Sequence, residues 1–350
     1  MGGPALVAGL LFFCYGPAMG LFLSPDETGH FPVSLITGFL GSGKTTLLNR
    51  LLRHSRMAGT AVVINEFGDV PLDQHFIEKT DGEVVVMANG CLCCSLNGDL
   101  EGIVGTLFAK REAGSIPAFE RLVVETTGLA DPAPIMQLLL NSPLIGRSFR
   151  LDAVVATVDA VHGMRALDEH EEAIKQAAIA DRIVITKTDL ADPEPLVARL
   201  RALNPGAALF QVVMGEIDPD LLFGVGEVAL RDPVRWLGPI AHLHHHGRDD
   251  VDAFCLTSDQ PLDWREFQRW LTRIKVREAD RLLRVKGMVD VVGEDGPVIV
   301  HGVHHVFHPP VKLETWPEGD RTTKLVFITR GLDRAGIEAE WRAFLDGVPA

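Results

Sequence analysis

The sequence is poor in basic residues and in spaced cysteines, and each shortage excludes a class of protein. Its 33 Lys and Arg stand against 47 Asp and Glu, which gives a net charge of −14. Nucleic-acid-binding proteins concentrate basic residues, so we expect no nucleic-acid partner. Five cysteines occur in 350 residues, and three share one tetrapeptide. Disulfide-stabilised secreted domains spread their cysteines along a short chain, so a reducing compartment is favoured.

The first 24 residues carry no charge, yet they lack the features of an export signal or a membrane span. No basic region precedes the apolar run, and Gly16 and Pro17 interrupt it short of the ~20 residues that a membrane helix needs. We interpret residues 1–30 as an apolar leader, with Met19 as an alternative start. The sequence therefore predicts a cytoplasmic protein with no membrane partner.

Short unbroken apolar runs recur along the first two thirds of the chain, as in strands that are buried on both faces. Segments of helical periodicity separate several of them, which is typical of βαβ crossovers. We predict an α/β domain over residues 31–223, with a doubly wound, mainly parallel sheet. The predicted strands span residues 33–36, 61–64, 84–86, 122–124, 153–158, 183–185 and 209–213.

The pattern changes after residue 223, where Gly, Pro and His become frequent. We predict a linker over 224–250 and a smaller α+β C-terminal domain over 251–350. Within it, Asp263 is expected to cap a helix, and strands and a final helix follow.

The segment GFLGSGKTT follows one of the predicted strands and precedes a helical run. It matches the pattern GxxxxGK[ST], in which glycines let backbone N–H groups surround a phosphate, the lysine contacts the β- and γ-phosphates and the hydroxyl ligates Mg²⁺. The context of strand, turn and helix makes this signal specific. The expected phosphate site is Gly38, Gly41, Ser42, Gly43, Lys44, Thr45 and Thr46.

Two further motifs follow predicted strands. Glu125 ends an apolar run and Gly128 follows it, which suits a carboxylate that holds Mg²⁺ or water and an N–H that reads a γ-phosphate. In the later segment TKTD, Asp189 can accept hydrogen bonds from guanine that adenine does not offer, and the stem of Lys187 can lie along the ring. Thr186 stands where many GTPases have Asn, so one orienting hydrogen bond is expected to be lost.

Three thiols in four residues predict a soft-metal site, at Cys91, Cys93 and Cys94. The fourth ligand is left open among Glu66, a histidine and water. Histidines also cluster at 242–246, which leaves metal capture and a solvated loop as alternatives. A second cluster falls on a predicted strand, where alternation would put His304 and His308 on one face and His301 and His305 on the other.

At these residues the chain resembles the CobW-like metallochaperone GTPases, relatives of the nickel-inserting GTPases of hydrogenase and urease maturation. The motifs GFLGSGKTTLLN, INEFG, NGCLCC, ETTGLADP and TKTD occur in family order, and the later segments ADRLLRVKG and HGVHHVF resemble the family's C-terminal domain. The resemblance implies a P-loop GTPase domain with a smaller C-terminal domain. It also implies slow GTP hydrolysis, and zinc or cobalt at the CxCC cysteines.

We therefore predict a GTP-hydrolysing chaperone that holds Zn(II) and transfers it to a metal-requiring client, with GTP and Mg(II) as further ligands and a homodimer left open. Co(II) delivery for cobalamin synthesis is the alternative within this class. A passive His and Cys metal store would leave Lys44, Thr45 and Asp189 without a role. A small-molecule kinase would leave TKTD without one.

Overall fold

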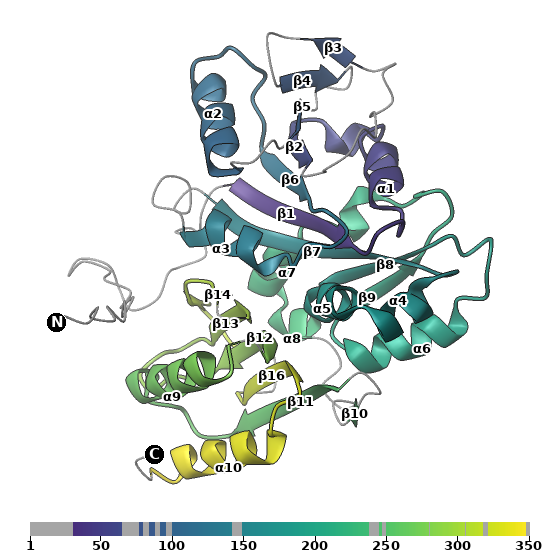
Figure 1. The fold of residues 1–350 in the computed structure, drawn as a ribbon. Helices are drawn as coiled ribbons and strands as arrows, with labels where there is room; N and C mark the ends of the chain where they lie inside the picture. Colours follow the sequence, from purple (N-terminus) through teal and green to yellow (C-terminus); the bar gives the residue numbers. More distant parts are fainter. Residues whose placement is uncertain are drawn as a thin grey trace, which may run out of the picture.

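The computed structural model describes most of the chain from residue 31 onward, in segments. Two β-sheets, each covered by helices, make up the molecule (Figure 1). Within the described part, no helix combines the length and apolar character that a membrane crossing requires. The described residues are 31–64, 77–79, 84–87, 92–95, 100–141, 149–237, 245–246, 250–279, 281–304, 306–317 and 321–347.

The first sheet has nine strands in the order β3-β4-β5-β2-β6-β1-β7-β8-β9. From β5 to β9 all neighbours are parallel, and the antiparallel pairs, β3 with β4 and β4 with β5, lie at one edge. This confirms the predicted doubly wound, mainly parallel sheet. The strands are β1 (Phe31–Gly38), β2 (Thr60–Ile64), β3 (Ile77–Lys79), β4 (Val84–Met87), β5 (Leu92–Ser95), β6 (Arg121–Glu125), β7 (Phe149–Asp159), β8 (Arg182–Thr186) and β9 (Ala208–Gln211).

Helices cover both faces of this sheet, and the central strands are fully buried between them (Figure 1). Side chains such as Leu35, Val123 and Val154 have no exposed surface, as expected for unbroken apolar strands. The helices are α1 (Lys44–Leu51), α2 (Leu100–Glu112), α3 (Ala133–Asn141), α4 (Gly163–Glu169), α5 (Glu171–Ile179), α6 (Glu194–Leu203), α7 (Val225–Arg231) and α8 (Pro233–Leu237).

Helices α7 and α8 lie inside the predicted linker, which is thus structured over 225–237. Asp152 on β7 fixes the start of α7. Its carboxylate accepts hydrogen bonds from the N–H of Gly224 at 2.8 Å and of Gly226 at 3.0 Å. Gly224 has φ 79°, which favours glycine. The Gly-rich composition here reflects a tight helix start.

The second sheet is antiparallel, in the order β10-β11-β16-β12-β13-β14, with β15 on β13. Asp263 accepts hydrogen bonds from the N–H of Arg265 and Glu266, as its predicted capping role requires. The elements are β10 (His245–His246), β11 (Val251–Ser258), α9 (Trp264–Arg277), β12 (Leu282–Val289), β13 (Val298–Val303), β14 (Val306–Phe307), β15 (Val311–Lys312), β16 (Thr323–Arg330) and α10 (Arg334–Leu345).

The predicted alternation of histidines is wrong. Strand β13 ends at Val303, and His304 turns the chain with φ 50°. The hairpin then brings His308 back against His301, with their rings stacked 4.6 Å apart. Period-2 alternation holds only while a strand continues.

The two sheets share a buried interface. Leu283 and Met288 of β12 belong to the same apolar cluster as β7 and α5. Asp181, just before β8, contacts Arg284 at 2.6 Å and Lys286 at 3.2 Å across this interface. All three side chains are buried, and the charges are therefore paired away from water.

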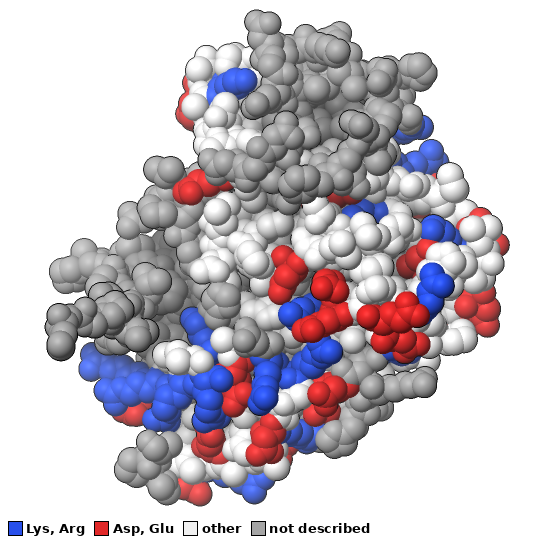
Figure 2. All heavy atoms as spheres, in the orientation of Figure 1, with Lys and Arg blue, Asp and Glu red and all other residues white. Residues whose placement is uncertain are grey.

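Basic side chains gather over α9 on the face shown in Figure 2. The exposed arginines of this helix, Arg265, Arg269, Arg273 and Arg277, repeat every four residues. They lie on the second sheet's covering helix, away from the phosphate motif on the first sheet. The acidic balance of the whole chain thus coexists with one local basic face.

Candidate functional site

The segment between β1 and α1 forms a tight loop that only glycine tolerates at several positions. Gly41 and Gly43 have φ of 70° and 94°, in the left-handed region. At Gly38, φ is 142°, and a Cβ would overlap Thr157 on β7. The glycines of the motif are thus required by backbone shape, as expected of a loop whose N–H groups turn inward.

Lys44 lies inside this loop and is only 5% exposed. Its ammonium donates hydrogen bonds to the backbone oxygens of Gly38 at 2.9 Å and Phe39 at 3.2 Å. The backbone carbonyls of the loop therefore hold the lysine ammonium at the N-terminus of α1. The arrangement keeps a cation ready beside the loop's N–H groups.

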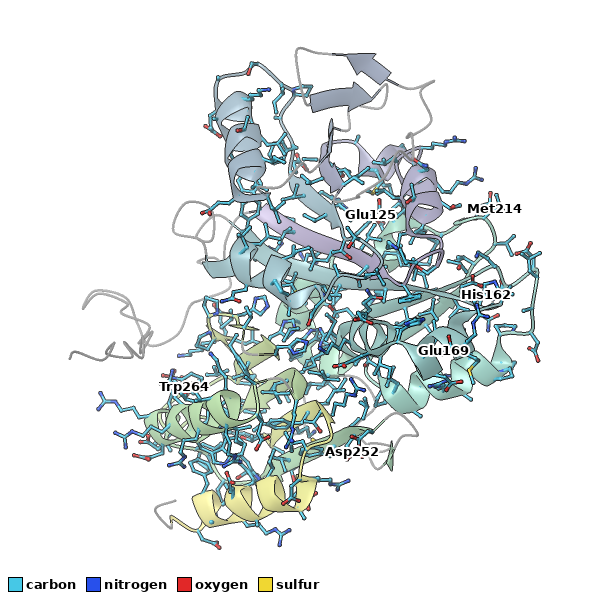
Figure 3. The ribbon with its side chains drawn as sticks, viewed as in Figure 1. Glu125, His162, Glu169, Met214, Asp252 and Trp264 are labelled. Carbon is cyan, nitrogen blue, oxygen red and sulfur yellow. The ribbon has the colours of Figure 1, made fainter. Side chains whose placement is uncertain are left out.

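Thr45 and Glu125 are 80 residues apart in sequence and meet in the structure. The Thr45 hydroxyl donates a hydrogen bond of 2.9 Å to Glu125 at the carboxyl end of β6. The parallel pairing of β1 with β6 sets Ile36 opposite Glu125 and so places the carboxylate beneath α1. Figure 3 shows Glu125 beside α1, at the carboxyl edge of the sheet. Two hard oxygen donors, which suit Mg²⁺, are thus adjacent.

Gly128 packs against the phosphate loop. A Cβ at this position would lie 2.7 Å from the Leu40 backbone nitrogen. The buried Gln176 of α5 donates hydrogen bonds to the backbone oxygens of Gly128 at 3.1 Å and Ala130 at 3.0 Å. Gln176 therefore anchors the segment after Glu125. This role was not predicted from the sequence.

The TKTD segment is tied to the phosphate loop by two side chains. Thr186 donates a hydrogen bond of 2.7 Å to the backbone oxygen of Ser42, and Lys187 donates one of 2.9 Å to that of Gly41. Thr186 thus supplies an orienting hydrogen bond through its hydroxyl, although we expected one to be lost at this position. Asp189 follows with an exposed side chain. Residues predicted to contact phosphate and base are brought together.

Further supports for the loop come from β7. The Ser42 hydroxyl is 2.6 Å from that of Thr157, and Asp159 contacts Lys187 at 2.5 Å. No role for Thr157 or Asp159 was predicted from the sequence. The available signal was the polar end of an apolar run, the same signal that marked Glu125.

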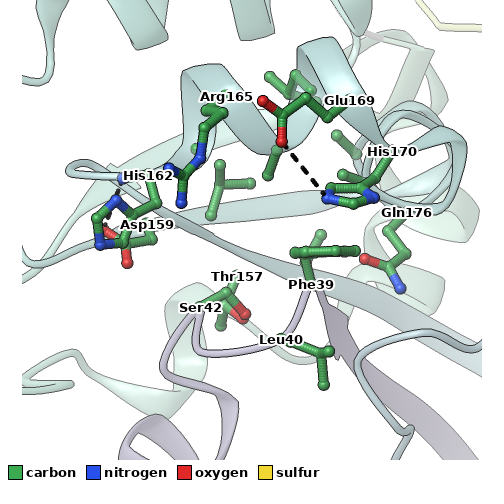
Figure 4. A pocket seen from close by; sticks show the side chains of 17 residues that line it. Phe39, Leu40, Ser42, Thr157, Asp159, His162, Arg165, Glu169, His170 and Gln176 are labelled. Carbon is green, nitrogen blue, oxygen red and sulfur yellow. Dashed lines mark hydrogen bonds and ion pairs between the residues drawn. The ribbon is translucent and has the colours of Figure 1, made fainter.

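A cavity of about 150 Å³ lies between the phosphate loop and helices α4 and α5 (Figure 4). Phe39, Leu40, Glu169 and His170 are among the residues that line it, and the His170 ring stacks 4.4 Å from that of Phe39. Pockets for drug-sized ligands span ~300–1,000 Å³, so this cavity is too small for a nucleotide. It is a hollow beside the loop, and Ser42 of the loop also lines it.

The predicted metal residues fall largely outside the described part. Glu66 and Cys91 lie outside it, and for Cys93 and Cys94 only the backbone, in β5, is described. Among the described side chains, no group of three or more His, Cys, Asp or Glu is placed to hold a metal. Strand β5 pairs with β2, and β2 with β6, which sets Ser95 in one row with Glu125.

Comparison with known proteins identifies relatives over nearly the whole chain. Residues 32–211 match the model of the CobW/HypB/UreG nucleotide-binding domain, and residues 251–345 match that of the cobalamin synthesis protein cobW C-terminal domain. A zinc chaperone of Escherichia coli (strain K12), YjiA, is 35% identical over 88% of this chain and 96% of its own.

The zinc chaperone CobW of Pseudomonas aeruginosa is 30% identical, over 90% of this chain and 91% of its own. A crystal structure of the Zn(II)-bound YjiA GTPase from E. coli matches with a TM-score of 0.75 and 33% identity, and covers 92% of this chain and all of that one. The resemblance drawn from the motifs is confirmed: the chain belongs to the CobW/HypB/UreG family of P-loop GTPases.

Proposed function

We propose that the protein is a GTP-driven metal chaperone that holds Zn(II) at Cys91, Cys93 and Cys94, with Glu66 as a further ligand, and passes it to a metal-requiring client protein. Its relatives are named zinc chaperones, and its sequence carries the thiols for the same cargo. Because GTP is an intracellular nucleotide, we place the protein in the cytoplasm.

In the proposed hydrolysis, each residue acts from the position that the loop gives it. Lys44 neutralises charge on the β- and γ-phosphates, and the Gly128 N–H donates to the γ-phosphate. Thr45 and Glu125 would hold Mg²⁺, which when bound offsets the charge that develops on the phosphate oxygens. Glu125 also orients the attacking water, and Asp189 selects guanine.

The observation that carries the coupling of metal to nucleotide is the strand register. Cys94 precedes Ser95, which shares a row with Glu125 across β2. With strands ~4.8 Å apart, two spacings put the backbones of Ser95 and Glu125 roughly 10 Å apart. A rearrangement of the segment after Glu125 would therefore reach the thiol-bearing strand within one or two side-chain contacts.

Zinc titrations in two nucleotide states test this proposal. We expect Zn(II) affinity to differ ~5–150-fold between GDP and a non-hydrolysable GTP analogue, and bound Zn(II) to change GTP affinity by the same factor. A triple Cys91→Ser, Cys93→Ser, Cys94→Ser variant should lose the difference. Parallel Co(II) titrations decide which metal is coupled to GTP.

Cys255→Ser is the matched control. Burial raises the pKa of the Cys255 thiol to about 11, so it is not a thiolate at neutral pH and is a poor metal ligand. We expect this variant to titrate like the native protein. Equal Zn(II) affinity in both nucleotide states would contradict the chaperone proposal and leave a GTPase with an independent metal site.

A further inference from the structure

Asp159, the last residue of β7, holds two parts of the chain at once. One carboxylate oxygen accepts hydrogen bonds from the N–H of Val161 at 2.7 Å and of His162 at 3.3 Å, which caps the turn after the strand. The other accepts the ammonium of Lys187 at 2.5 Å. Asp159 is only 5% exposed, so the carboxylate side of this charge-assisted contact is buried.

Lys187 is fixed at both of its ends. Its backbone has φ 57°, a conformation that is uncommon for residues other than glycine, and its carbonyl accepts the N–H of Leu190 at 3.0 Å. Its ammonium lies between Gly41 and Asp159. The side chain between these ends keeps 37% of its surface exposed. The alkyl stem is thus held beside the phosphate loop and remains partly exposed.

We propose that Asp159 is a positioning residue for purine binding, a role that rests on the proposed base site at Lys187 and Asp189. By holding the ammonium, Asp159 keeps the Lys187 stem extended so that a purine ring can lie against it. Without this contact the stem regains rotamer freedom, which binding would then have to remove.

Asp159 and Asp189 make separate contributions to nucleotide recognition. Asp159 acts through Lys187 on the face of the ring, which guanine and hypoxanthine share. Asp189 acts on the ring edge, where only guanine carries the exocyclic amine. Asp159 should therefore set the affinity for purine triphosphates without setting the preference for GTP over ITP.

A double-mutant cycle with three ligands tests the proposal. Asp159→Asn keeps a side-chain oxygen for the turn and weakens the contact to Lys187. We expect GTP and ITP to bind roughly 10- to 100-fold more weakly by calorimetry, and inorganic tripolyphosphate to bind as before. Lys187→Ala should show the same pattern. The double variant should bind GTP like Lys187→Ala alone. Additive losses, or an equal loss for tripolyphosphate, would overturn the inference.

A second variant addresses poor folding of Asp159→Asn. Asp159→Glu retains the charge, and its carboxylate can still reach the lysine ammonium. Affinity for GTP closer to the native value than that of Asp159→Asn supports the proposal. Equal affinities of the two variants would contradict it, because the charge would then be irrelevant.

Asp152→Asn is the matched control, since Asp152 is another buried aspartate of β7, seven residues from Asp159 and bonded to Gly224 and Gly226. We expect it to lower stability and leave the ratio of GTP to tripolyphosphate affinity unchanged. Asp189→Asn tests the base site itself. An unchanged preference for GTP over ITP in that variant would refute the base site, whereas a changed preference with an additive cycle would refute only the role of Asp159.

Discussion

Two aspartates near the ends of neighbouring strands each hold a lysine, and their surroundings differ. Asp159 holds Lys187, whose side chain is 37% exposed at the candidate nucleotide site. Asp181 holds Lys286 and Arg284, whose side chains are 6% and 2% exposed between the two sheets. An aspartate paired with a basic side chain thus lies at a partly exposed site in the first case and in a buried interface in the second.

Closure of the interface shifts the pKa values of these groups. Burial lowers the pKa of Lys286 to about 8, although Asp181 opposes the shift. The pKa of Asp181 itself is lowered: burial acts to raise it, but Arg284 and Lys286 together outweigh that effect. Charges in the interface depend on one another for their ionised state. Removing one of them should therefore affect stability first and nucleotide binding little.

The largest expected effect is on stability, from Asp181→Asn. This change leaves Arg284 and Lys286 buried without their counter-charge, which costs ~3–5 kcal/mol in comparable buried pairs. We expect denaturant unfolding to show this loss, and GTP to bind the folded protein with native affinity. Weakened GTP binding without a loss of stability would erase the distinction between the two regions.

Lys44→Ala should have the opposite profile. Because the ammonium bonds to loop carbonyls and is proposed to serve the phosphates, we expect GTP turnover to fall at least ~100-fold, measured by phosphate release. The thermal midpoint should change by only a few degrees. Lys110→Ala on α2 is the control and should keep native turnover. Native turnover in folded Lys44→Ala protein would refute the phosphate-site assignment.

Acid should weaken the interface between the two sheets. Burial first, and then Arg284, lower the pKa of His308 to about 4, below its ordinary value of 6.5. Between these values the unfolded chain binds more protons than the native one, so stability falls as pH falls from 6.5 to 4. At ~1.4 kcal/mol per pH unit, the loss of stability between these values amounts to ~3 kcal/mol from this histidine. Thermal midpoints across this range should fall less steeply for His308→Gln, and parallel curves would contradict the assignment.

The smallest effect concerns Thr186. Removing its hydroxyl in Thr186→Val breaks the hydrogen bond to the Ser42 carbonyl. A neutral hydrogen bond contributes ~0.5–1.5 kcal/mol, so GTP affinity should drop ~2- to 12-fold by calorimetry. Thr186→Ser keeps the hydroxyl and should bind GTP like the native protein. Equal binding by the valine variant would show that this contact does not order the site.

Sequence patterns predicted the elements that depend on residues close together in the chain. The phosphate loop could be predicted because its glycines, lysine and threonine act within eight residues, and most of the sheet because most of its strands are apolar runs. Strands β3 and β5 are not such runs, and the sequence did not predict them. Asp263 was predictable as a cap for the same reason, since its hydrogen bonds reach only Arg265 and Glu266.

Contacts between distant segments could not be predicted in this way. Asp159 meets Lys187 after 28 residues, and Gln176 reaches back 48 residues to Gly128. Such pairs depend on the order of strands and the packing of α5, which no sequence period encodes. The strand pattern around the histidines failed because one residue, His304, adopts a positive φ and reverses the chain.

The apolar cluster shared by the two sheets has a consequence for folding. Leu283, Met288 and Ile299 lie in the same core as the strands that carry the phosphate loop. Exposing that core to solvent in one part would expose it in the other, so the molecule should unfold in a single cooperative transition. Ligand binding adds RT ln(1 + [L]/Kd) to the stability of such a unit. Nucleotide should accordingly slow amide exchange in β12 as well as in β1, although β12 belongs to the other sheet.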